Sequence, residues 1–350
     1  MGLHTEAYRR QVGLWLIFMC VLVFLMVIVG GLTRLTQSGL SMVEWRPIMG
    51  VLPPIGEMGW IEVFEKYKSS PEYQKINYGM SLSEFKKIFW FEYGHRLLGR
   101  FIGLAFFFPF VYFLFKKAIP KALLPKLIGL FILGGMQGVI GWWMVKSGLV
   151  NRPDVSHIRL TIHLGMAFLL YVFLLWIGLT HLRNRHIAIQ HKIRYRMGFV
   201  LIGLVFSTVL SGGLVAGLNA GSQFNTFPLM AGKWIPTGLY YMDPWYSNII
   251  ENMMTIQFNH RYLALTTAFL TICFFFWNRK LELGRSGSIA RYCMISMICI
   301  QVFLGIATLL SVVWLPLASL HQTGAIVLLT TVIWTTHEIC YVETKTTNAL

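Results

Sequence analysis

The stretch GGLTRLTQSGLSMVEWRPIMGVLPP, residues 30–54, recurs 182 positions later as GGLVAGLNAGSQFNTFPLMAGKWIP, residues 212–236. Both copies open with two glycines and a leucine, carry a further glycine at 39 and 221, and reach a proline at 54 and 236. Each copy begins at the end of a long apolar run. A match of this length predicts that the chain contains two related halves.

The rest of the repeat brings ionisable and amide side chains into register, at spacings of 165, 164 and 158 residues. The corresponding residues are Glu92, His95 and Arg96 with Gln257, His260 and Arg261, then Gln137 and Gly141 with Gln301 and Gly305, and last His163 with His321. Changes in loop length produce this kind of drift in spacing. We therefore expect two repeats, residues 1–190 and 191–350.

Composition indicates a membrane protein. Hydrophobic residues make up 56% and charged residues 13% of the 350 positions, and the mean hydropathy is +0.61, which excludes a soluble globular protein. Apolar runs of about 20 residues, enough to cross the hydrocarbon core, lie near 12–33, 95–115, 123–145, 158–181, 197–217, 258–277, 291–313 and 317–337. The sequence predicts an all-α polytopic membrane protein whose eight transmembrane helices form two duplicated four-helix bundles, which enter the membrane in the same sense.

Basic residues set the predicted orientation. The net charge of +16 resides largely in loops near 116–126, 183–196 and 279–291, as the positive-inside rule requires, so we do not expect a nucleic-acid partner. These loops and both termini are then cytoplasmic, and the loops near 34–91 and 218–257 face outward.

The first apolar run is too long for a signal-peptide core, and no transit peptide precedes it. We expect a bacterial inner membrane rather than a mitochondrial one, and no disulfide in the outer loops, which hold no cysteine.

Four histidines stand out because each lies near the outer end of a different even-numbered span: His95, His163, His260 and His321. Ionisable side chains inside a bilayer are rare and usually functional, and two imidazoles from facing helices can supply both axial ligands of a haem iron. A single histidine is more often a polar link between helices, but four in matching positions favour a metal or haem. No cysteine or carboxylate cluster accompanies them at the spacing of a zinc or copper site. The remaining histidines, at span ends or in loops, are expected to be solvated: His4, His157, His181, His186, His191 and His337.

The two halves differ beside the histidines. Glu92 precedes His95 by three residues and shares its helical face, whereas the neutral Gln257 precedes His260. A carboxyl group beside a haem can donate or accept a proton, or orient a substrate. Alternatively, Glu92 is only a charged residue at the start of its helix, at the membrane interface.

The nearby arginines and glutamines each allow two interpretations. Arg96, Arg100 and Arg261 either pair with haem propionates or extend to lipid headgroups. The intramembrane amides of Gln137 and Gln301 either hold helices together or contact a cofactor.

The eight spans, the duplication, the ExxHR motif at Glu92–Arg96 and one histidine on each even span resemble the haem A synthase family over nearly the whole chain. The resemblance implies oxidation of the C8 methyl group of haem O to a formyl group, by successive hydroxylations and loss of water, which gives haem A for cytochrome oxidase. It implies that His95 and His163 hold the substrate haem O in the N-terminal half with Glu92 assisting, while His260 and His321 ligate a resident haem b. The long loop 34–91 is similar to that of proteobacterial and mitochondrial members. Some members carry a pair of cysteines in an outer loop, and this chain has no cysteine there.

The implied partners are haem O and the farnesyltransferase that supplies it, a membrane electron acceptor and the lipid bilayer; a homo-oligomer is compatible with the sequence. Two other functions remain open. A bis-histidine b-type cytochrome would only transfer electrons, but such proteins commonly carry two ligands on one helix. A haem transporter or chaperone would present haem at the outer surface, but Met144 follows Trp142 and Trp143 where a tryptophan-rich haem-handling motif would end in Asp.

Overall fold

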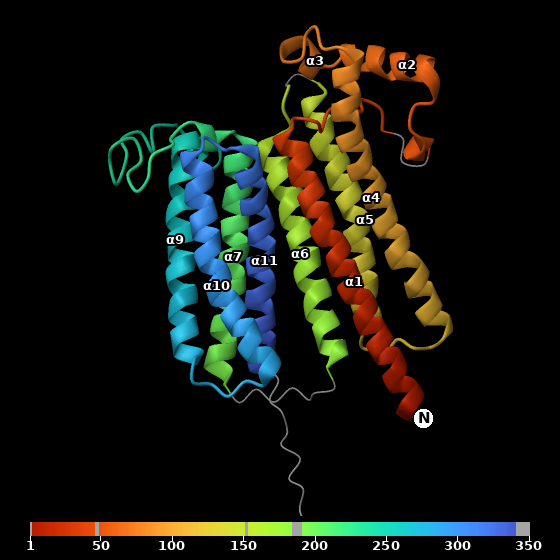
Figure 1. Ribbon diagram of the computed structural model, residues 1–350, viewed down its shortest axis with the longest axis vertical. Coiled ribbons are helices and arrows are strands. Elements are labelled where there is room, and N and C mark those ends of the chain that lie inside the picture. The colour runs from red at the N-terminus through yellow and green to blue at the C-terminus, as the bar shows by residue number, and fades with distance from the viewer. Residues whose placement is uncertain (1, 46–48, 151–152, 184–190, 341–350) are drawn as a thin grey trace, which may run out of the picture.

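Long helices lying side by side make up most of the protein (Figure 1). The structure is a computed structural model that describes residues 2–45, 49–150, 153–183 and 191–340. In this part of the chain there are eleven α-helices, two short 3₁₀ segments (Met49–Val51 and Ala220–Ser222) and no strand. The long helices are α1 (Gly2–Leu35), α4 (Leu82–Phe115), α5 (Leu124–Gly148), α6 (His157–Leu182), α7 (Lys192–Gly217), α9 (Met253–Asn278), α10 (Arg285–Leu310) and α11 (Leu315–Cys340). The short ones are α2 (Gly56–Lys68), α3 (Pro71–Lys75) and α8 (Ser247–Ile250).

Every apolar run that we expected to cross the membrane coincides with one of these long helices, although the run near 291–313 extends past the end of α10 at Leu310. Within the described residues, seven of them are long and apolar enough to span a bilayer. The helix outside this group is α9, where Asn259, His260 and Arg261 follow one another near one end and Asn278 closes the other. An eighth span therefore stays a prediction.

Contacts between the long helices follow the same pattern in both halves of the chain. Helix α1 packs on α4 and α6, and α5 packs on α4 and α6. In the second half α7 packs on α9 and α11, and α10 packs on α9 and α11. The halves meet where α6 contacts α7 and α11, and where α1 contacts α11. The predicted boundary after residue 190 lies next to 184–190, outside the described residues.

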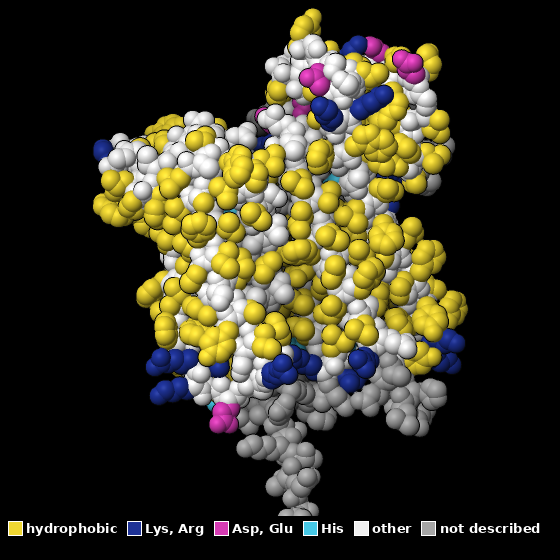
Figure 2. Space-filling view, in the orientation of Figure 1, with side chains coloured by type: hydrophobic (Ala, Val, Ile, Leu, Met, Phe, Trp, Pro, Cys, Tyr) yellow, Lys and Arg dark blue, Asp and Glu magenta, His cyan; other side chains and the backbone are white. Residues whose placement is uncertain are grey.

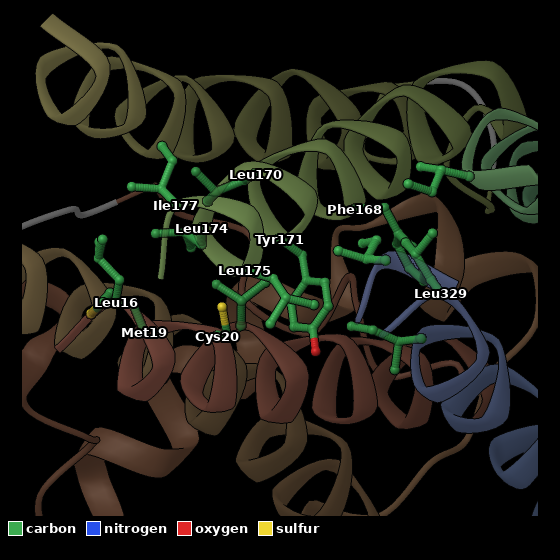
Figure 3. Packing of buried hydrophobic residues seen from close by; sticks show 14 of the residues in the cluster. Leu16, Met19, Cys20, Phe168, Leu170, Tyr171, Leu174, Leu175, Ile177 and Leu329 are labelled. Atoms are coloured by element: carbon green, nitrogen blue, oxygen red, sulfur yellow. The ribbon is translucent and has the colours of Figure 1, made fainter. Parts of the chain in front are cut away.

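The best-buried part of the molecule lies where α1, α6 and α11 meet (Figure 3). Leu16 and Met19 of α1, Phe168 and Leu174 of α6, and Leu329 of α11 are at most 1% exposed. Inside a bilayer, helix association depends on close packing because lipid tails are as apolar as leucine. This junction therefore fixes how the two halves are oriented relative to each other.

Charged side chains separate to the two ends of the bundle. Lys and Arg gather at the end where α1 begins, and most acidic side chains visible in the same view lie at the other end (Figure 2). Lys116 and Lys117 close α4, Lys192 opens α7, and Arg279 follows α9. This is the distribution from which we predicted the orientation, and the orientation itself remains a prediction.

The loop near 34–91 folds into helices that the sequence analysis did not anticipate. Helix α2 packs on α4 and α3 packs on α2, and α4 begins at Leu82, well before the apolar run. A capping box starts α4: the Ser81 hydroxyl accepts from the Glu84 amide, and a Glu84 carboxylate oxygen accepts from the Ser81 amide at 2.8 Å. The aromatic cluster that holds this outer subdomain together consists of Phe64, Tyr67, Phe85, Phe89 and Tyr93.

Two histidines that we expected to be solvated are buried. The ring of His157, at the start of α6, is 4% exposed, and its Nε2 lies 2.8 Å from the carbonyl oxygen of Ile250. His337 of α11 is fully buried, with Nε2 at 3.2 Å from Thr180 Oγ1. The prediction was wrong for both because each ring lies where one half packs on the other, which no local pattern reveals. His4 and His186 fall outside the side chains that the structure describes. All five cysteines are free thiols.

Candidate haem sites

Each of the four histidines lies against a glycine of a neighbouring helix. A Cβ placed on Gly30 of α1 would lie 3.1 Å from His95 Nε2, and one on Gly141 of α5 would lie 3.2 Å from His163 Cε1. An ordinary contact begins at 3.4 Å. The imidazoles therefore occupy space that any larger residue at these positions would take.

The second half repeats this arrangement. A Cβ on Gly212 of α7 would lie 3.1 Å from His260 Cε1, and one on Gly305 of α10 would lie 3.0 Å from His321 Cε1. These glycines are the ones that recur in the sequence repeat, 182 and 164 residues after their counterparts. The recurrence of glycine at these positions thus has a steric explanation, because each glycine leaves room for an imidazole.

The histidines of each half lie near each other. His95 and His163 are close enough for their charges to interact, and so are His260 and His321. His260 and His321 line one cavity of about 430 Å³, whose walls come mainly from α7, α9, α10 and α11, with contributions from α6 and the end of α1, and are mostly apolar. This volume is typical of a site for a small molecule or cofactor.

Two arginines bring positive charge to this cavity. Arg261 and Arg34 both line it, and the Nε atom of each is buried without a hydrogen-bond partner among the described residues. The Nη2 atom of Arg34 donates to the Ala216 carbonyl oxygen at 3.2 Å and to Asn219 Oδ1 at 3.1 Å, so this first-half arginine is held on the second half. Buried guanidinium N–H groups suit carboxylates such as haem propionates.

The imidazoles of the second half are also fixed from the Nδ1 side. Ser211 Oγ lies 2.8 Å from His260 Nδ1, and Gln301 Nε2 lies 3.2 Å from His321 Nδ1. When His260 Nδ1–H donates to the serine hydroxyl, its Nε2 remains available to a metal. By contrast, His163 Nδ1 is buried with no hydrogen-bond partner in the described part of the chain.

Glu92, the carboxylate expected beside the first pair, fastens the outer loop to α4. Its Oε2 accepts from the Ser41 hydroxyl at 2.7 Å and from the Met42 amide at 2.8 Å, and its Oε1 accepts from Arg96 Nη2 at 2.5 Å. The side chain is only 3% exposed. Arg96 also donates to the carbonyl oxygens of Met42 at 3.0 Å and Glu44 at 3.2 Å. Glu92, about one turn before His95, and Arg96, directly after it, therefore form a loop clamp.

The same clamp exists in the second half without the carboxylate. Arg261 donates to the carbonyl oxygens of Phe224 at 2.5 Å and Thr226 at 2.7 Å, which correspond in the repeat to Met42 and Glu44. Gln257 donates to the Phe224 carbonyl oxygen at 3.2 Å and accepts from Arg261 at 3.3 Å. An amide is thus sufficient to hold the loop, and the negative charge of Glu92 is additional to this task. Arg100 follows one turn after Arg96 and has no arginine counterpart, because Leu265 stands there.

The donors present suit haem iron better than a small metal ion. Among the described residues, no group of three or more His, Cys, Asp or Glu side chains could hold a metal ion. A haem requires only axial ligands from the protein, and histidine pairs with nearby arginines provide ligands and propionate partners.

Sequence reasoning missed Arg34, Ser211 and the role of the glycines. The recurrence of Gly30 and Gly141 was visible and could have suggested close approach. Arg34 and Ser211 gave no such signal, because Ala216 and Val29 occupy the corresponding positions of the repeat.

The chain is similar to known proteins along most of its length. Residues 13–333 match the family described as cytochrome oxidase assembly protein. A protein of Nitrosospira multiformis named haem A synthase is 51% identical over 336 residues, which cover 95% of this chain and 94% of the relative. Proteins of the same name from Nitrosomonas eutropha and Parvibaculum lavamentivorans are 48% and 44% identical, covering 93% and 96% of this chain and the same shares of the relatives. With two pairs of histidines set on repeated glycines, and with relatives this similar along their whole length, the chain belongs to the cytochrome oxidase assembly family that includes the haem A synthases.

Proposed function

We propose that the protein is a haem A synthase, an oxidoreductase that converts the C8 methyl group of haem O into a formyl group by successive hydroxylations and loss of water. The observation that carries the proposal is the pair of imidazoles in each half, each resting on a repeated glycine. Family membership supports the same activity. We further propose that both halves belong to one duplicated design of eight spans, which the matching helix contacts and loop clamps support.

We assign haem O to the first half and a resident haem b to the second. His260 and His321 would be the axial ligands of haem b, with Arg261 beside its propionates, and the bound iron would supply a redox centre. Support comes from Ser211, which can accept from His260 Nδ1–H and so leave Nε2 to the iron, and from Gln301, which donates to the His321 carbonyl oxygen and holds that residue in place. His163 lacks such a bond, which suits a substrate that must enter and leave.

In the first half, His95 and His163 would hold haem O by its iron, and Arg96 and Arg100 would lie near its propionates. Glu92 would place a negative charge one turn from the iron ligand, where it can accept a proton released during oxidation. Its hydrogen bonds to Ser41, Met42 and Arg96 fix this charge in position. A hydrophobic, farnesylated substrate can enter such a site sideways from lipid.

The cellular setting follows from the same proposal. We place the protein in a bacterial inner membrane with both termini in the cytoplasm; residues 341–350 lie outside the described chain. The basic residues at the end where α1 begins support this orientation. Haem O would come from its farnesyltransferase, and a membrane electron acceptor would take the electrons.

The test is to express the protein in a host supplied with haem O, extract its haems and identify them by chromatography with mass detection. Haem b together with haem A or its hydroxylated precursor, absent from an empty-vector control, is the expected result. Haem b alone in both halves would replace the proposal with an electron-transferring cytochrome.

The variant Glu92→Gln separates charge from loop anchoring, because it recreates the Gln257–Arg261 pair in the first half. We expect it to fold and to keep haem b while losing formation of haem A. The reciprocal variant Gln257→Glu is the matched control and should still make haem A. If Glu92→Gln produces haem A at the wild-type rate, Glu92 serves only to anchor the loop.

A further inference from the structure

The glutamines Gln137 and Gln301 occupy equivalent positions in the repeat but have different surroundings. Gln301 of α10 donates from Nε2 to the His321 carbonyl oxygen at 2.9 Å and lies 3.2 Å from Nδ1 of the same residue. Both amide atoms of Gln137, on α5, are buried and have no hydrogen-bond partner among the described residues. Buried polar groups without partners are rare in folded proteins, and each calls for an explanation.

The explanation lies on the facing helix. A Cβ on Gly324 of α11 would lie 2.2 Å from Gln301 Oε1, so the position of Gln301 depends on the absence of a side chain there. At the spacing of 158 residues that relates His163 to His321, the counterpart of Gly324 is Met166 of α6. By the repeat, Met166 takes the position of Gly324, and we infer that its side chain fills the space that Gln301 uses in the second half. This would keep Gln137 from approaching His163 as Gln301 approaches His321.

The position of Gln137 places its amide beside the first haem site. It lies one turn before Gly141 on α5, and therefore on the same helical face. Gly141 is the glycine on which the ring of His163 rests. The unpaired amide is thus one turn from the contact that positions an iron ligand, on the side away from the outer loops.

We propose that Gln137 is a substrate-binding residue that forms a hydrogen bond with a hydroxyl group on the edge of the haem held by His95 and His163. This inference rests on the proposed function of the first site. An amide offers both a donor and an acceptor, and a hydroxyl group can use either. Two hydroxyl groups fit: the one beside the farnesyl chain of haem O, and the one that the first oxidation adds to the methyl group.

The binding test uses purified full-length protein that retains its second-half haem, titrated with haem O or with protohaem and followed by absorbance. Protohaem has the same iron and propionates but no hydroxyl group. If the farnesyl-side hydroxyl is the partner, Gln137→Leu weakens haem O binding about tenfold or more and leaves protohaem binding unchanged. Met136→Leu, a change at the exposed neighbouring position of α5, is the matched control.

If the hydroxyl added by the reaction is the partner, haem O binding stays at the wild-type value. The Gln137→Leu enzyme then releases the hydroxymethyl haem, which mass detection finds outside the protein and which the wild type retains. Wild-type haem O affinity together with wild-type retention of this intermediate would overturn the proposal.

A second variant tests the effect of the Met166 side chain directly and leaves Gln137 in place. Met166→Gly opens the space that Gly324 leaves in the second half, so Gln137 can turn toward His163. We expect the same defect as in Gln137→Leu, and no further loss when both changes are combined. Additive losses in the double variant would overturn the proposal.

The variant His163→Ala separates this inference from the function on which it rests. Wild-type haem O binding in His163→Ala would contradict the assignment of the substrate site itself. Loss of haem O binding in His163→Ala, with wild-type behaviour of Gln137→Leu, would overturn only the role of Gln137.

Discussion

The glycines beneath the histidines make the sharpest prediction, because the perturbation is a single methyl group. In Gly212→Ala the new Cβ lies 3.1 Å from His260 Cε1, and in Gly305→Ala it lies 3.0 Å from His321 Cε1. Ordinary contact begins at 3.4 Å, so the rings must move by at least 0.3 Å and 0.4 Å. Metal–ligand distances tolerate about 0.2 Å. The substitution therefore disturbs iron ligation even though it leaves the ligand in place.

The expected loss in haem b affinity is about 10- to 100-fold, the range seen when groups that orient a metal ligand are changed. In free energy this is about 1.4 to 2.7 kcal/mol. Alanine also favours a helix over glycine by about 1 kcal/mol, so the helix itself is not weakened. The loss of haem affinity should thus not be accompanied by a loss of helix content.

The assay is a titration of haem-depleted protein with haem b, followed by absorbance, with thermal unfolding measured in parallel. Gly203→Ala is the matched control, since it lies on the same helix α7 and a Cβ there meets nothing within 4 Å. Gly203→Ala should bind haem b as the wild type does. Equal haem affinity of Gly212→Ala and Gly203→Ala would refute the proposal that Gly212 leaves the room that the His260 ring needs to bind iron.

Two further predictions concern a ligand partner and a buried carboxyl. Ser211→Ala removes the hydroxyl 2.8 Å from His260 Nδ1 and should weaken haem b binding about tenfold, whereas the exposed Ser207→Ala should not. Burial, opposed by the Tyr67 hydrogen bond, raises the pKa of the Glu72 carboxyl in α3 from 4.5 to about 7. The folded protein thus favours protonated Glu72, and this stabilisation, about 3 kcal/mol at most, is complete below pH 4.5 and lost as the pH rises through about 7. Melting temperatures measured across this range should fall accordingly, and Glu72→Gln should remove the slope; an unchanged slope would contradict the assignment.

The sequence alone determined the all-helical class, the positions of the long helices and the four histidines. These features follow from composition, from the length of apolar runs and from a repeat, all of which are local or periodic. The repeat also contained the glycines that contact the histidine rings, although the sequence did not show that they leave room for these rings. The pairing of His260 with His321 across one cavity agreed with the bundle that the repeat predicted.

Only the tertiary structure decided what the partners of these residues are. Glu92 and Arg96 hold the loop of a subdomain whose helices lie in a segment without a clear apolar pattern. His157 and His337 are buried because the two halves meet at their positions. Gln301 reaches His321 beside Gly324, whereas the amide of Gln137 has no hydrogen-bond partner among the described residues. Such contacts join residues that are far apart in the chain. They depend on how the helices pack against one another, and no local sequence pattern predicts them.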